Sequence, residues 1–235
     1  MTDVQRTYLP AAGHDWSLPL YDPLVKLLGG DSARRVLLDQ ADLQPGQRVL
    51  EVGCGTGTLL MLLARAQPAL ELTGLDPDAR ALARAKRKAD AASISIRLDR
   101  GFSDTLPYSD ASFDRVLSCF MLHHLSSADE KVRTLREIRR VLKPGGRLHL
   151  LDFAQPEAAH RANVVARWMH SMHRLEDNTD TRVRSFMDDA GLVAPTTLRR
   201  ATMFIVFGLA YYQAVAPKSE RRRLGRLDRC EHIGI

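Results

Sequence analysis

The chain has 235 residues, of which 45% are hydrophobic and 26% are charged, and its formal net charge is +6. Such a length can bury a full α/β core, and these proportions are ordinary for a folded globular protein, which excludes a disordered or fibrous chain. No apolar run approaches the roughly 18 residues of a membrane-spanning helix, and residues 1–10 lack the basic and apolar parts of a secretory signal.

The cysteines and the basic residues indicate the cellular compartment and the kinds of ligand to expect. Cys54, Cys119 and Cys230 cannot all pair internally and have no metal-ligand spacing, so we expect a reducing cytoplasm and no metal site. The basic excess gathers at residues 80–88 and 218–229. The first stretch interleaves apolar residues at helical spacing, which favours the solvated face of a helix. The second favours a basic tail, with a contact surface for nucleic acid as the alternative.

Along the chain, short apolar runs alternate with helical patterns, which is typical of a parallel sheet covered by helices on both faces. Strands are predicted at about 48–52, 70–75, 94–98, 113–118 and 147–153. Helices are predicted at about 31–41, 58–66, 78–91, 127–141 and 180–190. Two last apolar segments, 192–199 and 203–215, predict an antiparallel hairpin, although residues 203–216 fit a helix equally well by pattern.

The most informative segment is a strand, a glycine-rich turn and a helix between residues 48 and 66. Gly53, Gly55 and Gly57 allow a tight turn with close approach of the backbone. The helix that follows directs free amides and the positive end of its dipole at a polar ligand. The spacing disfavours NAD, because the third glycine of a dinucleotide turn would fall on Thr58. These features predict a site for a nucleoside cofactor.

Asp76 ends the second predicted strand, shortly after this helix. A carboxylate at that place can accept both hydrogen bonds of a ribose diol. A turn aspartate that caps the helix beginning near Asp78 fits the sequence equally well.

The pattern Glu51-x-Gly53-x-Gly55-x-Gly57 resembles the first motif of class I S-adenosylmethionine (SAM)-dependent methyltransferases. Leu106-Pro107-Tyr108 and Ser112-Phe113-Asp114 resemble the ubiquinone and menaquinone biosynthesis branch, of the methyltransferase domain 11 type. Lys143-Pro144-Gly145-Gly146 resembles the turn before the fifth strand of that family. The resemblance implies an α/β, Rossmann-like, doubly wound seven-stranded sheet, mostly parallel with an antiparallel last strand. It also implies SAM as cofactor and S-adenosylhomocysteine (SAH) as product.

The resemblance carries a set of cofactor-binding residues over to this sequence. They are Tyr21, Glu51, Gly53, Cys54, Gly55, Gly57, Asp76, Pro77, Gly101, Phe102, Ser103, Cys119 and Phe120. A backbone carbonyl near Cys119 is expected to hold the methionine amino group. Tyr21 resembles an aromatic residue that lies over the cofactor, and packing of an N-terminal arm on the core is its alternative.

Phe102 departs from the family pattern, because many relatives carry an aspartate there for the adenine amino group. Its ring is expected to pack on adenine, while the Ser103 backbone or Asp104 supplies the polar contact. A core role for Phe102 and a turn role for Asp104 fit equally well.

His123 and His124 follow the fourth predicted strand, where ligands bind in doubly wound folds. An imidazole there can accept a proton or orient an acceptor, so both are candidate catalytic residues. A structural role at the helix entry is the alternative for either one. The pair offers too few ligands for a metal.

Three parts of the chain are predicted around this core. Residues 1–30 are expected to form an N-terminal lid or arm, and residues 31–217 the SAM-dependent methyltransferase domain. Within that domain, residues 156–190 are expected to be an insertion that covers the acceptor. Residues 218–235 are the basic C-terminal tail.

The expected activity is in-line methyl transfer to oxygen, nitrogen or carbon of a small-molecule acceptor, mainly by alignment of the reactants. A nucleic-acid methyltransferase is disfavoured, because Ser118-Cys119-Phe120-Met121 stands where such enzymes carry an Asn/Asp-Pro-Pro-Tyr/Phe motif. Arsenic methylation is disfavoured because the three cysteines are not placed to converge. A SAM-binding regulatory protein without turnover is the alternative from another class. The sequence leaves a homodimer open as the assembly.

Overall fold

The computed structural model describes residues 29–154, 178–203 and 207–218. Most of the predicted N-terminal arm, including Tyr21, lies outside these ranges. The same holds for residues 156–177 of the predicted insertion and for residues 219–235 of the predicted tail. None of the helices within the described ranges is long and apolar enough to cross a membrane.

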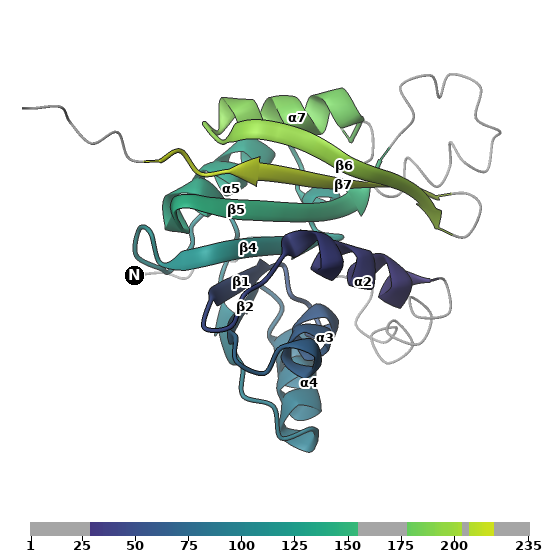
Figure 1. The fold of residues 1–235 in the computed structure, drawn as a ribbon, viewed down its shortest axis with the longest axis vertical. Helices are drawn as coiled ribbons and strands as arrows, with labels where there is room; N and C mark the ends of the chain where they lie inside the picture. Colours follow the sequence, from purple (N-terminus) through teal and green to yellow (C-terminus); the bar gives the residue numbers. More distant parts are fainter. Residues whose placement is uncertain (1–28, 155–177, 204–206, 219–235) are drawn as a thin grey trace, which may run out of the picture.

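Seven strands form one sheet in the order β3-β2-β1-β4-β5-β7-β6 (Figure 1). Their bounds are β1 Arg48–Val52, β2 Glu71–Asp76, β3 Arg97–Arg100, β4 Phe113–Cys119, β5 Leu142–Phe153, β6 Val193–Met203 and β7 Phe207–Val215. Strands β1 to β5 pair in parallel, and β7 runs antiparallel to both of its neighbours. The predicted fold class is therefore confirmed, and the final segment forms a strand of a hairpin rather than a helix.

The helices cover both faces of the sheet because the buried side chains of each strand alternate between the faces. The helices are α2 Gly30–Ala41, α3 Thr58–Ala66, α4 Ala79–Ala91, α5 Ala128–Val141 and α7 Asp180–Asp189. On one face, Leu37 of α2 and Leu59 of α3 pack in one buried cluster with Leu117 of β4. On the other face, α5 and α7 pack in a second cluster with Val116, the neighbouring residue of β4.

Two strand boundaries differ from the prediction for local reasons. Strand β3 begins three residues late, because Ser93 adopts a φ of 55° and the amide of Ile94 still donates to Ala89 in the last turn of α4. Strand β5 begins five residues early, because Lys143-Pro144-Gly145-Gly146 forms part of the strand rather than a turn before it. The register with β4 jumps from Leu142 to Arg147 over this segment, which is a bulge.

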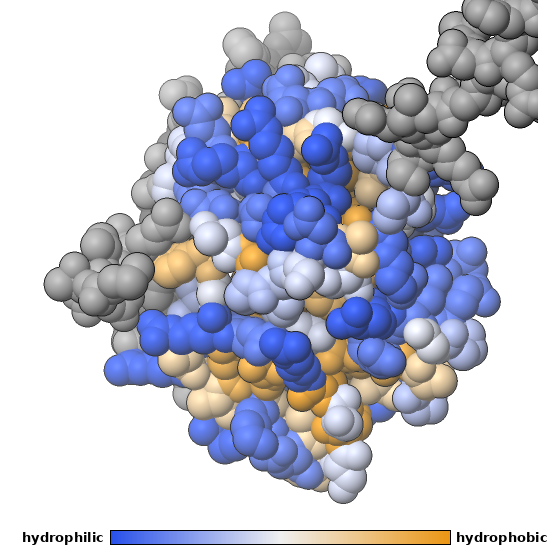
Figure 2. All heavy atoms as spheres, turned by 90° about the vertical axis from the view of Figure 1, so that its left-hand side faces the viewer, coloured by the Kyte–Doolittle hydropathy of each residue, from blue (hydrophilic) through white to orange (hydrophobic). Residues whose placement is uncertain are grey.

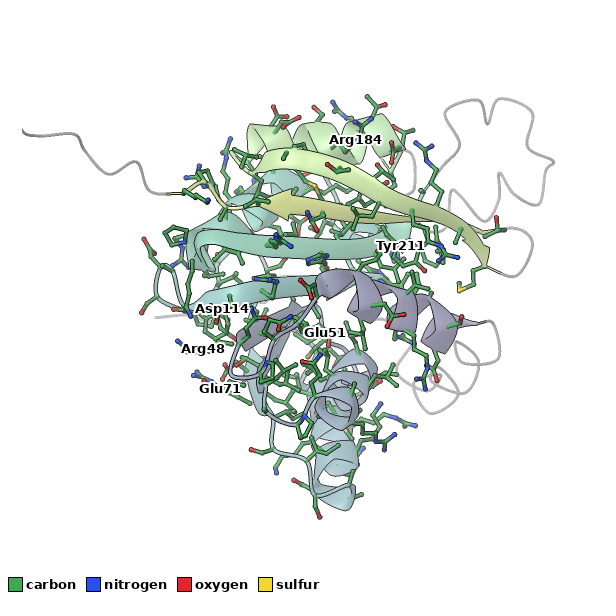
Figure 3. The ribbon with its side chains drawn as sticks, in the orientation of Figure 1. Arg48, Glu51, Glu71, Asp114, Arg184 and Tyr211 are labelled. Atoms are coloured by element: carbon green, nitrogen blue, oxygen red, sulfur yellow. The ribbon has the colours of Figure 1, made fainter. Side chains whose placement is uncertain are left out.

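Asp114 joins three strands at the amino ends of the sheet. Its carboxylate accepts a hydrogen bond from the amide of Arg48 at 2.9 Å and contacts the ammonium of Lys143 at 2.7 Å. Figure 3 shows Asp114 beside Arg48 and Glu71 at this end of the molecule. The residues that face solvent here are largely hydrophilic, with hydrophobic residues gathered in smaller areas (Figure 2). The carboxyl ends of the parallel strands meet at the opposite edge of the sheet.

Candidate functional site

A cavity of about 300 Å³ lies at the carboxyl ends of β1, β2 and β4. Most of the predicted cofactor-binding residues line it, together with one predicted catalytic residue. These are Glu51, Gly53, Cys54, Gly55, Asp76, Pro77, Phe102, Ser103, Cys119, Phe120 and His124. Three predicted residues, Gly57, Gly101 and His123, are not among the described residues that line it. The volume falls within the roughly 300 to 1,000 Å³ of small-molecule sites.

The three glycines of the turn have different roles, although all adopt a positive φ. A Cβ on Gly53 would lie 2.3 Å from the Met121 side chain, and one on Gly57 would lie 2.9 Å from Ala85. These two positions therefore require glycine for packing within the protein. A Cβ on Gly55 would meet no atom within 4 Å, so this residue borders open space. Gly101 packs on Leu75 behind the cavity wall.

The carboxylate of Asp76 links two backbone segments that border the cavity. One oxygen accepts from the Gly55 amide at 2.8 Å, and the other accepts from the Asp78 amide at 2.9 Å. Asp78 itself is the N-cap of α4, so the capping role falls two residues after Asp76. Burial raises the pKa of Asp76, while the two backbone hydrogen bonds lower it. Each carboxylate oxygen still has acceptor capacity for a ligand hydroxyl.

Glu51 and Arg34 both line the cavity, Glu51 from β1 and Arg34 from α2. Glu51 is only 3% exposed, and burial raises the pKa of its carboxyl to about 8 even though Arg34 opposes the shift. Arg34 lines the same cavity from α2, and its guanidinium lies 5.8 Å from the centre of the Phe120 ring. The cavity therefore contains a buried carboxyl beside a buried guanidinium.

Phe102, Ser103 and Asp104 form the wall beyond β3. The hydroxyl of Ser103 lies 2.9 Å from the hydroxyl of Thr134 on α5, which fixes this loop to the helix. The carboxylate of Asp104 lies 3.7 Å from the guanidinium of Arg133. The Phe102 ring lines the cavity, so it is available to pack on a flat ligand.

The end of β4 carries an unusual backbone conformation. Phe120 has a φ of 57°, which is uncommon for a bulky residue and is typically retained only where the surroundings impose it. Its amide donates to Leu151 of β5 at 2.8 Å, and its ring packs 5.1 Å from that of Phe153. This conformation turns the chain sharply after Cys119, so that both residues line the cavity.

The two predicted catalytic histidines differ in environment. His124 lines the cavity, whereas His123 is buried behind it, and their ring centres lie 4.1 Å apart. The Nδ1 atom of His123 lies 2.6 Å from the carboxylate of Asp152, at the end of β5. The same carboxylate accepts from the backbone amides of His123 and Phe153. Asp152 therefore fixes the ring that packs against His124.

Arg34 and Asp152 were absent from the residues expected at the site. Arg34 occupies a buried position of an amphipathic helix, between Ala33 and Leu37, where an arginine is uncommon. Asp152 is the penultimate residue of the apolar strand β5, and Asp76 is the last residue of β2. A charged residue in an otherwise apolar face or strand is the signal that could have identified both.

The cysteines near the cavity are protonated thiols. Cys54 and Cys119 are free and buried, and burial raises the pKa of both, that of Cys119 to about 12. Neither is therefore poised as a thiolate nucleophile. Within residues 29–154, 178–203 and 207–218, no group of three or more His, Cys, Asp or Glu side chains could hold a metal ion.

Comparison with known proteins agrees with this geometry. Residues 49–146 match a family model described as "Methyltransferase domain". The demethylmenaquinone methyltransferase of Deinococcus radiodurans is 39% identical over 141 residues, which cover 59% of this chain. The chain spans 57% of the length of that curated relative.

Two solved structures share the fold at low identity. Phosphoethanolamine N-methyltransferase 2 of Haemonchus contortus, in complex with SAM, has a TM-score of 0.74 at 14% identity, covering 88% of this chain and 58% of that one. The [4+2]-cyclase SpnF has a TM-score of 0.66 at 22% identity, covering 80% of this chain and 81% of that one. Residues 49–146 therefore match a methyltransferase domain, and the fold of the chain agrees with that of these solved structures.

Proposed function

We propose that this protein is a SAM-dependent methyltransferase that transfers a methyl group to oxygen, nitrogen or carbon of a small organic acceptor. The observation that carries the proposal is the cavity at the carboxyl ends of β1, β2 and β4, which the glycine turn and Asp76 border. A reaction in the cytoplasm accords with the sequence.

The residues present fit the cofactor. Gly55 borders open space that a larger residue would occupy, and the Asp76 carboxylate has acceptor capacity left for the ribose hydroxyls. Phe102 offers a ring to the adenine, and Arg34 offers a guanidinium to the carboxylate of the methionine part. When bound, SAM supplies a methyl group on a sulfonium, whose departure as a neutral thioether makes the transfer favourable.

The residues near His124 would orient the acceptor and receive its proton. His124 lines the cavity and contacts the ring of His123, which Asp152 holds by a hydrogen bond. In this arrangement His124 is the catalytic residue, and His123 and Asp152 are positioning residues. Alignment of the reactants can contribute roughly 7 to 11 kcal/mol, whereas a general base typically contributes about 10²- to 10⁴-fold in rate.

The names of the relatives support one acceptor class for the first test. Proteins named as demethylmenaquinone or ubiquinone/menaquinone biosynthesis methyltransferases are 33 to 39% identical to this chain over 140 or 141 residues. We therefore propose an acceptor with a reduced, hydroxylated aromatic ring as the first class to test. The SpnF structure, named as a cyclase, shows why fold alone does not fix the reaction.

Calorimetry with SAM, SAH and NAD tests the cofactor, and incubation with methyl-labelled SAM and a panel of phenolic, amine and quinol acceptors tests the reaction. We expect binding of SAM and SAH in the micromolar range, no binding of NAD, and label in at least one small acceptor. Binding of NAD without SAM would overturn the proposal. Binding of SAM with no transfer to any acceptor would favour the regulatory alternative.

A further inference from the structure

The cavity has a charge opposite to that of the whole chain. The chain carries a formal net charge of +6. Five of the residues that line the cavity are acidic, whereas Arg34 is the one lysine or arginine among the described lining residues. The acidic residues are Glu51, Asp76, Asp78, Asp104 and Glu130. An acidic cavity in a basic protein favours a ligand that carries positive charge.

Most of these carboxylates already have partners within the protein. Asp76 accepts from two backbone amides, Asp78 caps α4, and Glu130 accepts from the Ser126 amide at 2.7 Å. Asp104 lies near Arg133. Their charges are therefore held largely by groups of the protein itself.

Two of the acidic residues, Glu51 and Asp78, each have one buried carboxyl oxygen, Oε2 and Oδ2, without a hydrogen-bond partner among the residues that the structure describes. Asp78 caps α4 with its other oxygen, whereas Glu51 lies within strand β1 and caps no helix. Glu51 is 3% exposed. It lies near the centre of the molecule (Figure 3) and lines the cavity beside the glycine turn. A buried carboxyl oxygen without a partner is costly, so such an atom in a cavity points to a ligand or to a proton that occupies it.

We propose that Glu51 selects the positively charged methyl donor over the neutral product and couples donor binding to the release of a proton. The inference rests on the proposed function. SAM carries one positive charge more than SAH, because the sulfonium becomes a thioether when the methyl group leaves. An ionised Glu51 stabilises the donor by that extra charge, whereas a protonated Glu51 treats the two ligands alike. The product lacks the sulfonium charge, so an ionised Glu51 does not stabilise it as it stabilises the donor, and the product is released more readily.

The groups around Glu51 bring the pKa of its carboxyl close to neutral pH. Burial is the main cause that raises its pKa to about 8, and Asp76 on β2 acts in the same direction. Arg34 on α2, the Leu60 amide on α3 and Lys88 on α4 lower it. The thiols of Cys54 and Cys119 also face this carboxyl and remain protonated. Near pH 7, Glu51 is thus mostly protonated before a cation enters, and a cation lowers its pKa.

These protonation states determine the direction in which SAM affinity changes with pH. The ionised form of Glu51 binds the donor better, so SAM affinity rises with pH up to about pH 8 and then levels off. We expect a rise of about tenfold between pH 6.5 and 8.5 for SAM and a smaller change for SAH.

Titration calorimetry at pH 7.3 in buffers of different ionisation enthalpy measures the proton directly, without turnover. The ligands are SAM, SAH and sinefungin, whose amine carries the positive charge without a transferable methyl group. Glu51→Gln removes the titrating group, and Glu51→Asp retains a carboxyl. Glu71→Gln, at an exposed glutamate at the start of β2, is the matched control. Each variant is compared with the wild type at every pH, so the ligands' own titrations cancel.

We expect wild-type protein and Glu71→Gln to release a fraction of a proton on binding SAM or sinefungin, and less on binding SAH. Glu51→Gln should release none, and its preference for SAM over SAH should fall about tenfold relative to wild type. Proton release that is equal for SAM and SAH in the wild type, once the titration of each ligand's own amino group has been subtracted, overturns the inference even if no Glu51 variant folds. Unchanged release in a folded Glu51→Gln protein does so as well. Failure of all three ligands to bind wild type overturns the proposed function itself.

Discussion

Gly55 is the residue of the turn whose side-chain space belongs to the cavity. A Cβ there would meet no protein atom within 4 Å, and the same is true of Gly46, which lies in a turn before β1 and also has a positive φ. Valine at either position carries backbone strain of roughly 1 to 3 kcal/mol. We predict that Gly55→Val abolishes SAM binding in calorimetry, whereas Gly46→Val lowers the melting temperature without changing affinity. Full SAM affinity in Gly55→Val would show that the cofactor does not approach this turn.

Alanine variants of His124 and His123 should distinguish a chemical role in turnover from a structural role in stability. We predict that His124→Ala keeps SAM affinity and loses about 10²- to 10⁴-fold in turnover of an identified acceptor. His123→Ala should also lower the melting temperature, because it leaves the buried carboxylate of Asp152 without the ring that it contacts at 2.6 Å. Asp152→Asn, which keeps the shape, is the control for packing. Full turnover in a stable His124→Ala protein would leave catalysis to alignment alone.

At the scale of elements, the contact between α2 and β5 contains a buried histidine. His149 on β5 is fully buried, and neither ring nitrogen has a hydrogen-bond partner among the described residues. It lies on the face that α2 covers, since Leu151, two residues along β5, packs with Leu37 of α2. Burial, and then the nearby charges of Arg115 and Arg147, lower the pKa of His149 to about 4.

This histidine makes the fold sensitive to acid. Its folded pKa lies below the ordinary value near 6.5, so its contribution to stability is complete above about pH 6.5 and is lost as pH falls toward 4. We predict that the free energy of unfolding in urea falls by about 2 kcal/mol between pH 7.5 and 5 for this reason. His149→Leu should reduce that loss by a similar amount. An identical pH dependence in both proteins would mean that other groups cause it.

The elements were largely predictable because their signals are local. Alternation of apolar residues and glycines placed β1, α3 and β2 within a residue or so of their observed bounds. The errors arose where tertiary pairing overrides local signals. Strand β5 begins at Leu142, which pairs with Phe113 of β4, and it continues past Pro144 and Gly145 as a bulge, although these two residues indicate a turn in isolation. Residues 207–215 form a strand because they pair with β5 on one side and with β6 on the other.

The site was predictable where one motif supplies it and not where distant segments meet. Glu51, Gly55 and Asp76 follow from a pattern confined to two neighbouring strands. The contact between His123 and Asp152 joins a residue that follows β4 to a residue near the end of β5, and the parallel pairing of β4 with β5 brings these segments together. Arg34 reaches the cavity from a helix that precedes the motif altogether.

At the scale of the whole molecule, charge is divided between an acidic cavity and a basic remainder. The proposed acceptor is a small molecule, and the proposed cofactor site is the acidic cavity. Neither of the two ligands therefore needs the basic surface. Residues 219–235 contribute five arginines and three acidic residues to the formal net charge of +6. They lie outside the described ranges, and the lining residues that the structure describes all lie between Arg34 and Glu130.

Removal of residues 219–235 therefore tests whether the basic end of the chain serves the cofactor site. We predict unchanged SAM affinity in calorimetry, because deleting these residues lowers the formal net charge only from +6 to +4 and leaves all of the described lining residues in place. Electrophoretic mobility shifts with RNA and DNA, measured from low to high salt, provide the second measurement. Nucleic-acid binding by the full chain that falls steeply with salt and disappears on deletion would favour a polynucleotide acceptor, since phosphate contacts by arginine release counterions. We expect no such difference, because the arginines of this segment are matched in part by Glu220, Asp228 and Glu231.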